Sequence, residues 1–147
     1  MKQWVASCSL VVGLFVAGCD HLTGVRVMIH TKQRIDPACI PGAQEYLGPV
    51  NHFARLNLDP GIPGELYSVV RDGGNLNIVR YADEKQAILL EVGWIGPPRK
   101  EDERLSIRLL EDVERAVLQA CVLNSENSRI ERTCEGRRVC REAGIKK

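Results

Sequence analysis

The sequence of 147 residues is poor in the features on which several large classes of function depend. Aromatic residues make up only 5% of the chain, which is too few for a surface that stacks sugars or bases. Basic and acidic residues number 20 and 19, so no excess of positive charge favours nucleic acid. The chain has no phosphate loop, nucleophile elbow, zinc-protease helix or dinucleotide fingerprint. These absences predict a protein that is not an enzyme, uses no cofactor or metal and binds no nucleic acid.

The N-terminal segment is the most informative part of the sequence. Lys2 precedes an apolar stretch at residues 5–16 that is too short to cross a hydrocarbon core of about 30 Å. Two small residues, Ala17 and Gly18, stand directly before Cys19. This combination resembles the lipobox of bacterial lipoproteins, in which the signal peptide is cut before the cysteine and the cysteine carries the lipid. The alternatives are an ordinary secretory signal cut elsewhere and an uncleaved anchor.

The resemblance implies a membrane-bound protein of the bacterial cell envelope. Residues 1–18 would be removed, and Cys19 would receive a diacylglyceryl group, usually with a third acyl chain on its freed amine. Two or more acyl chains hold a protein firmly on a membrane, whereas one chain binds only marginally. Asp20 resembles the residue that retains enteric lipoproteins in the inner membrane, although this rule varies among bacteria. We therefore expect a lipid-anchored, periplasm-facing protein, with the inner membrane favoured and the outer membrane as the alternative.

The mature chain is expected to be one small domain between a short tether and a basic C-terminal segment. Removal of residues 1–18 leaves 129 of the 147 residues, which suits one hydrophobic core. The lipidated tether, residues 19–24, is short, so the domain of residues 25–123 should lie close to the bilayer. Residues 124–147 hold seven basic and four acidic side chains. This segment is either solvated or in contact with anionic lipid headgroups.

Cysteine usage indicates two disulfides. Four cysteines in an exported domain favour two bonds. A zinc site is the competing interpretation, but the sequence has no C-x-x-C pair and no histidine at ligand spacing from a cysteine. The segment between the last two cysteines is short and contains Gly136, so we expect these two to bond to each other and close the C-terminal segment. The two expected pairs are Cys134 with Cys140 and Cys39 with Cys121.

Alternating apolar residues and turn motifs predict an antiparallel sheet of four to five strands. The expected strands are residues 25–30, 52–58, 66–70, 76–81 and 87–95. Residues 72–75 read Asp-Gly-Gly-Asn between two apolar runs, which favours a tight hairpin with positive φ over a ligand-binding loop. His30 falls in the first strand, where we expect a half-exposed polar side chain and not a catalytic one, because no partner stands at triad spacing.

Two helices are expected to cover one face of this sheet. The shorter helix follows the Asp-Pro start signal at residues 36–37 and ends at the Gly-Pro pair of residues 48–49. The longer helix carries an apolar stripe from Leu105 to Ala120. Three acidic residues at 101–103 favour its N-terminus, and a cation site is their alternative role. The predicted fold class is therefore α+β, with a short and a long helix on one face of an antiparallel sheet stapled by two disulfides.

The pairing of Cys39 with Cys121 depends on the direction of the chain. Cys39 starts the short helix and Cys121 ends the long one, so the two meet only if these helices are antiparallel. With only the three strands after residue 65 between them, the helices would be parallel and the cysteines about 30 Å apart. A disulfide needs Cα atoms within about 7 Å. A fourth intervening strand at residues 52–58 reverses the chain once more, so the bond and this strand are predicted together.

The sequence supports three hypotheses for the function. The first is a membrane-anchored envelope lipoprotein whose small non-enzymatic domain serves interaction or assembly with an envelope protein partner. The second is an inhibitor or immunity lipoprotein that neutralises an envelope-acting toxin or hydrolase by loop insertion. The third, an envelope hydrolase, is the least favoured because no recognisable catalytic motif supports it.

Overall fold

The computed structural model describes the predicted domain and the C-terminal segment. The described residues are 22–57, 61, 63–82, 86–96 and 98–146. The predicted signal of residues 1–18, and with it Cys19 and Asp20, lies outside the described residues. Among the helices that the structure describes, none is long and apolar enough to span a bilayer.

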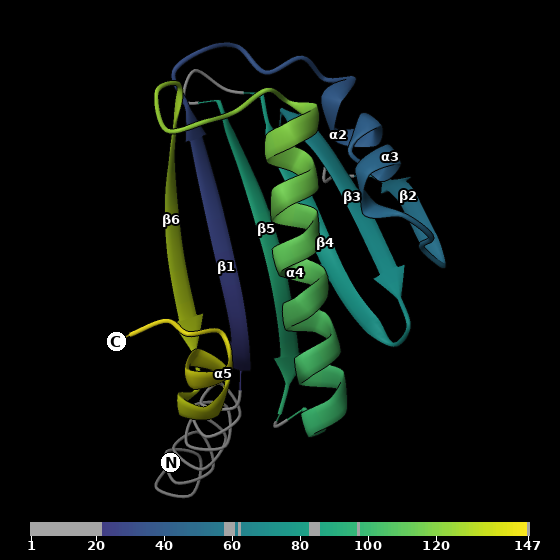
Figure 1. Ribbon diagram of the computed structural model, residues 1–147, viewed down its shortest axis with the longest axis vertical. Coiled ribbons are helices and arrows are strands. Elements are labelled where there is room, and N and C mark those ends of the chain that lie inside the picture. The colour runs from purple at the N-terminus through teal and green to yellow at the C-terminus, as the bar shows by residue number, and fades with distance from the viewer. Residues whose placement is uncertain (1–21, 58–60, 62, 83–85, 97, 147) are drawn as a thin grey trace, which may run out of the picture.

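Six strands form a single antiparallel sheet in the order β2-β3-β4-β5-β1-β6 (Figure 1). The strands are β1 (Leu22–Thr31), β2 (His52–Leu56), β3 (Gly64–Arg71), β4 (Gly74–Tyr81), β5 (Ala87–Ile95) and β6 (Ser128–Glu135). The strand β1 thus lies between β5 and β6, one position in from the edge of the sheet. The predicted α+β class is confirmed, and the strand expected within residues 52–58 is present as β2.

The prediction of four to five strands is wrong, because the C-terminal segment adds β6 to one edge of the sheet. β6 pairs with β1 from Gly24, opposite Glu135, to Thr31, opposite Ser128. The segment lacks the apolar alternation of a typical strand, since its charged residues outnumber its apolar ones. Charged side chains are common on edge strands, where they discourage pairing with other chains. Pairing with β1 therefore decides the structure of this segment more than its own apolar content does.

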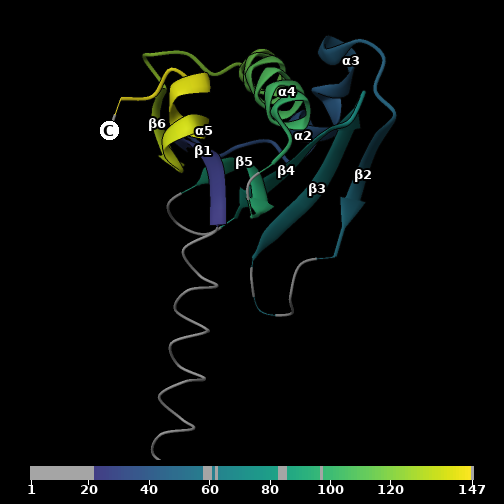
Figure 2. The ribbon, with the colours of Figure 1, turned by 90° about the horizontal axis from the view of Figure 1, so that it is seen from below.

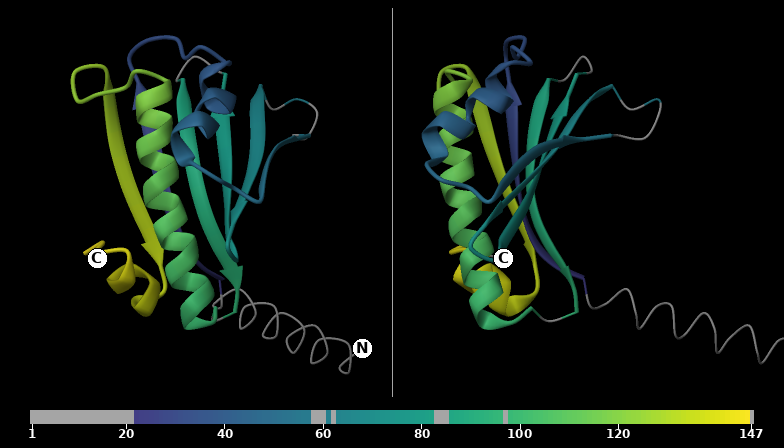
Figure 3. Two further views of the ribbon diagram at one scale, coloured as in Figure 1. Left: turned by 45° about the vertical axis from the view of Figure 1, so that its right-hand side comes forward. Right: turned by 90° about the vertical axis from the view of Figure 1, so that its right-hand side faces the viewer.

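The described helices all lie on the same face of the sheet (Figures 2 and 3). The long helix α4 (Lys100–Ala120) packs along β4 and β5. Two short helices, α2 (Cys39–Gly42) and α3 (Gln44–Leu47), lie beside it near β2 and β3. A last short helix, α5 (Arg137–Glu142), contacts β1, β6 and α4. The predicted arrangement, with helices on one face, is therefore present.

The predicted short helix consists of two separate turns. Its middle contains the Pro-Gly pair of residues 41–42, and both residue types disfavour a helix interior. The N–H of Ala43 is shared between the carbonyls of Cys39 and Ile40, at 3.0 and 3.1 Å, so the chain tightens between the turns. Gly48 ends the second turn with φ of 70°, a backbone conformation that glycine adopts without strain. The helix therefore ends where the sequence predicted.

The hydrophobic core fills the space between the sheet and α4. Side chains from the four central strands and from one face of α4 are almost fully buried. The core includes Val25, Val27, Ile29, Leu76, Ile78, Ile88, Leu90, Val92, Leu109, Val113 and Val117. Each aliphatic side chain buried in this way stabilises the fold by about 1.5–3 kcal/mol relative to an exposed one.

Both predicted disulfides are present. Cys39 is bonded to Cys121 with Cα atoms 4.9 Å apart, and Cys134 is bonded to Cys140 with Cα atoms 5.4 Å apart. Figure 1 shows that α4 ascends towards the end of the molecule at which α2 begins, as the pairing of Cys39 with Cys121 requires. The presence of β2 provides the additional chain reversal on which this pairing was predicted to depend.

Candidate functional site

The face of the sheet opposite the helices is covered by none of the described helices. In both side views, every described helix lies on one side, and the strands form the other side (Figures 2 and 3). Because side chains alternate along a strand, half of the sheet residues point towards this second side. We call it the uncovered face. Its composition decides whether it is an ordinary solvated surface or a binding surface.

An apolar row crosses the uncovered face from strand to strand. The cross-strand register places Leu56 opposite Leu66, Leu66 opposite Val79, and Val79 opposite Leu89. Leu89 lies opposite Met28 in turn, so the row runs from β2 to β1. With strands about 4.8 Å apart, these five side chains form a row roughly 19 Å long. We call this set of residues the apolar row.

The side chains of the apolar row are accessible from solvent. Leu56 is 42% exposed, and the other four members are partly exposed. The solvated face of an antiparallel sheet is normally polar, and isolated apolar residues on a surface need no explanation. Five apolar side chains that are adjacent across five strands form a contiguous patch. Contiguous exposed patches of this kind mark sites of interaction with other molecules.

Two polar pairs flank the apolar row on the side of β1. Arg26 donates a hydrogen bond of 2.7 Å to Glu91, and the ring of His30 lies 3.2 Å from a carboxylate oxygen of Glu131. The hydrogen bond to Glu91 and the charge of that carboxylate raise the pKa of Arg26, and Glu135 adds a smaller contribution. A protein interface commonly has this arrangement, with an apolar centre and a polar rim. His30 is thus a partly exposed strand residue, as predicted, and its ring has Glu131 as a polar partner.

The helix-covered side holds ion pairs that connect secondary structure elements. Glu65 lies 3.1 Å from both Arg55 and Arg80, and it accepts a hydrogen bond of 3.2 Å from Tyr67. These contacts link β2, β3 and β4. Burial, together with the charge and hydrogen bond of Glu65, raises the pKa of Tyr67. This cluster has the features of a structural network, because each charge has an opposite partner.

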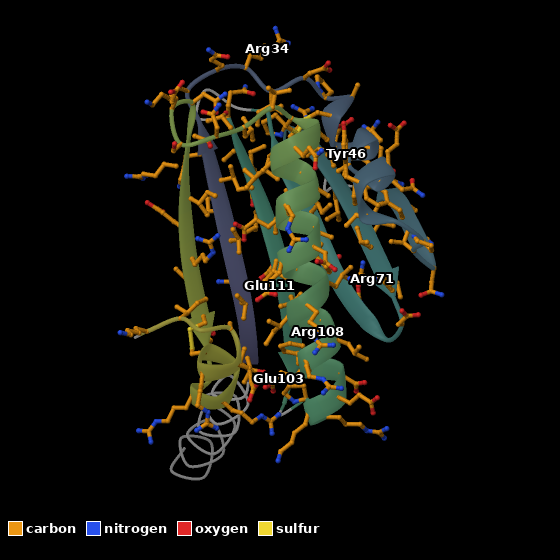
Figure 4. All side chains as sticks on the ribbon, viewed as in Figure 1. Arg34, Tyr46, Arg71, Glu103, Arg108 and Glu111 are labelled. Atoms are coloured by element: carbon orange, nitrogen blue, oxygen red, sulfur yellow. A yellow bond between two sulfur atoms is a disulfide. The ribbon has the colours of Figure 1, made fainter. Side chains whose placement is uncertain are left out.

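Two further pairs attach α4 to the elements around it. Arg71 of β3 forms an ion pair with Asp112 of α4, and Figure 4 shows Arg71 beside this helix. In the first turn of α4, Glu103 accepts hydrogen bonds of 2.9 and 2.7 Å from Arg138 of α5, which also donates one of 2.6 Å to the carbonyl of Pro98. Glu103 is almost fully buried. The acidic run at residues 101–103 thus contributes an ion-pair partner to the fold.

The residues singled out in the sequence are dispersed over the structure. The Asp-Gly-Gly-Asn motif forms the hairpin between β3 and β4, with Asp72 and Gly73 at positive φ. Within residues 124–147, Arg132 and Arg138 form ion pairs with Glu114 and Glu103 of α4, and Arg129 forms one with Glu131 of the same segment. No cluster of three potential metal-ligating side chains occurs among the described residues. The four disulfide cysteines are placed as predicted, and Cys19 lies outside the described residues.

Comparison with known proteins assigns no family to this chain. No known family model and no curated protein matches this chain.

Sequence reasoning missed the apolar row because it considered each strand separately. The outward positions of any one strand hold at most three apolar residues, mixed with polar residues or glycine, as in β3 with Leu66 and Val70. The row becomes visible only when the register between strands is known. The signal was present in part, since the hairpin at residues 72–75 fixes which residues of β3 and β4 face each other.

Proposed function

We propose that this chain is a lipid-anchored lipoprotein of the bacterial cell envelope whose domain binds an envelope protein through the apolar row. The lipid is carried by Cys19, and the domain faces the periplasm. Its role is interaction or assembly and not catalysis. Asp20 favours the inner membrane as the site of anchoring.

The sequence features at the N-terminus support the anchoring. A positive start, a short apolar stretch and the residues Ala17-Gly18-Cys19 together resemble a lipoprotein signal. The two disulfides of the domain suit an oxidising compartment such as the periplasm. Both features favour a protein that is exported and then held at a membrane.

The apolar row is the observation that carries the proposed binding. Six strands at about 4.8 Å spacing and about eight residues at a rise of 3.3 Å give the uncovered face an area of roughly 600 Å². A standard protein interface buries about 800 Å² on each partner. The uncovered face is therefore large enough to supply most of such an interface. Its apolar centre and its rim of polar pairs fit a protein surface better than they fit a small ligand.

Site-specific cross-linking in the full chain tests this proposal. A photo-reactive phenylalanine derivative at Leu66, in the centre of the apolar row, is expected to cross-link to an envelope protein in intact cells. The same residue at Tyr46 is the matched control, because Tyr46 is 51% exposed on α3, on the opposite side of the sheet (Figure 4). A second variant, Leu89→Arg, places a charge in the apolar row and should abolish the Leu66 cross-link.

The outcomes separate the proposal from its competitors. Equal cross-linking from Leu66 and Tyr46 would contradict a specific role for the uncovered face. A cross-link that appears only when an exogenous toxin or hydrolase is supplied would place the protein in the inhibitor or immunity class. Replacement of Cys19 by serine should release the protein from membranes and abolish lipid labelling, and retention of both would contradict the anchoring.

A further inference from the structure

A hollow opens in the uncovered face at the end of the sheet where β1 begins. Its volume is about 240 Å³. On the uncovered face it is bounded by Gly24 and Arg26 of β1 and by Glu91, Gly93 and Ile95 of β5, with residues of β6 on the third side. Gly24 of β1 and Gly93 of β5 lie directly opposite each other, so neither of these two strands places a side chain there. The hollow is thus a gap in the side-chain layer of an otherwise continuous sheet.

The fold does not require glycine at position 93. The pairing of β1 with β5 runs through nine consecutive residue pairs without a bulge, and Gly93 does not have a positive φ. A Cβ on Gly93 would meet only the carbonyl oxygen of Thr23, at an ordinary contact distance of 3.6 Å. Gly24 differs, because a Cβ there would lie 2.7 Å from the carbonyl oxygen of Val92. Glycine weakens a strand, and where geometry does not require it, it often marks the close approach of another molecule.

The size of the hollow suits one side chain. Pockets for cofactors and drug-sized ligands occupy about 300–1,000 Å³, which is larger than this hollow of about 240 Å³. Beside it, Ile95 is 93% exposed and offers an apolar contact. Gly93, which is exposed, and Gly24, which is partly exposed, form a floor without side chains. An aromatic side chain supplies the large, flat apolar surface that such a floor can bind.

The charges around the hollow favour a basic neighbour for that side chain. Arg26 is 57% exposed and forms an ion pair with Glu91. Glu135 of β6 also lies at the hollow and is exposed. Two carboxylates and one guanidinium leave a single net negative charge at the rim. A partner segment with a lysine or arginine beside its aromatic residue would complement this charge.

The hollow lies close to the proposed anchor. Ile95 pairs with Leu22, the first residue of β1, and Leu22 follows Cys19 by three positions in the sequence. Three residues span at most about 11 Å. If Cys19 carries lipid, the hollow is therefore held near the headgroups. Segments of membrane proteins at this depth are enriched in tryptophan and tyrosine.

We propose that this hollow seats an aromatic side chain, flanked by a basic residue, from the juxtamembrane segment of an integral membrane protein. This inference rests on the proposed function, because it identifies the partner that binds the uncovered face. It specifies an occupant by chemistry, namely an aromatic ring on the floor formed by Gly24 and Gly93 and a cation facing Glu91 and Glu135.

A direct test uses short peptide probes and the processed, lipidated protein in detergent micelles. Acetyl-Arg-Trp-amide is expected to shift the NMR amide signals of Gly24 and Gly93. Acetyl-Arg-Ala-amide and acetyl-Glu-Trp-amide should produce shifts that are smaller or absent. Gly93→Val fills the hollow and should weaken the binding of the first peptide by at least about tenfold. Ser68→Val, on the same face but two strands away on β3, is the matched control and should leave binding unchanged.

Several outcomes would overturn this inference. Shifts of equal size with the alanine peptide would exclude the aromatic seat, and unchanged binding by Gly93→Val would exclude the hollow as the site. Thermal unfolding of Gly93→Val, with Gly93→Ala as the milder variant, establishes that the fold is retained. In cells, a Leu66 cross-link that persists unchanged in Gly93→Val overturns this inference but leaves the proposed function intact. If the photo-reactive residue at Leu66 forms no cross-link when Gly93 is retained, both this inference and the proposed function are overturned.

Discussion

Removal of the Cys39–Cys121 disulfide should destabilise the domain far more than removal of the Cys134–Cys140 disulfide. The first pair joins residues 82 positions apart, and the second joins residues only six positions apart. In the chain-entropy model, the free energy contributed by a disulfide grows with the logarithm of the loop that it closes. This model gives about 4.5 kcal/mol for the long loop and about 2.4 kcal/mol for the short one. The expected difference is about 2 kcal/mol.

The structure adds a local consequence of the long-range bond. Cys39 is the first residue of α2, and Cys121 directly follows α4, so the bond ties the short helices to the end of the long one. The short helices α2 and α3 contact α4 but are only four residues each, and isolated helices of this length are unstable. Loss of the bond should therefore free α2 and α3 first.

Urea unfolding of two double-alanine variants measures this difference. With an m-value of about 2 kcal/mol/M, 2 kcal/mol corresponds to a midpoint about 1 M lower for Cys39→Ala/Cys121→Ala than for Cys134→Ala/Cys140→Ala. Hydrogen exchange should show loss of protection in residues 39–47 only in the first variant. Equal midpoints, or a lower midpoint for the short-loop variant, would refute the entropic argument for these two bonds.

Three further predictions concern single side chains. Arg138→Met leaves the carboxylate of Glu103 buried without its partner and should cost about 3 kcal/mol of unfolding free energy, most of which Glu103→Leu in the same chain should restore. The pKa of Tyr67 is raised in the folded protein, so the unfolded chain loses this proton at a lower pH. The free energy of unfolding should therefore fall as pH rises above about 10. Tyr67→Phe should make the melting temperature fall less steeply with pH in this alkaline range. Leu66→Thr should leave the melting temperature within a few degrees of the unaltered protein while weakening partner capture, because Leu66 is only partly buried.

The elements predicted correctly from the sequence are those with strong local signals. The hairpin between β3 and β4 follows from its Asp-Gly-Gly-Asn turn, and α4 follows from apolar residues spaced three and four apart. The Cys39–Cys121 bond joins residues far apart in the sequence, yet it could be predicted. Each strand or helix of this fold runs in one of only two opposite directions, so the number of intervening strands decides whether the two cysteines lie at the same end. The bond requires one more strand between the two helices, at residues 52–58. The structure contains both this strand, as β2, and the bond.

The elements missed are those decided by partners distant in sequence. β6 pairs with β1 across about a hundred residues, from Gly24 opposite Glu135 onwards, and its own residues are mainly charged. A period-2 apolar pattern is needed to recognise a strand from sequence, and an edge strand does not have to supply one. The placement of β1 inside the sheet is also non-local. Local signals thus predicted the meander, while the β5-β1-β6 half of the sheet required the three-dimensional structure.

The position of β1 connects the proposed anchor with both features of the uncovered face. Measured along this strand at 3.3 Å per residue, Gly24 lies about 7 Å and Met28 about 20 Å from Leu22. If Cys19 carries lipid, the hollow at Gly24 is the part of this face nearest to the anchor, and the apolar row lies farther along the sheet. A juxtamembrane segment alone could occupy the hollow but could not cover a row that extends over five strands. A partner that occupies both must therefore combine a membrane-embedded part with a folded periplasmic surface.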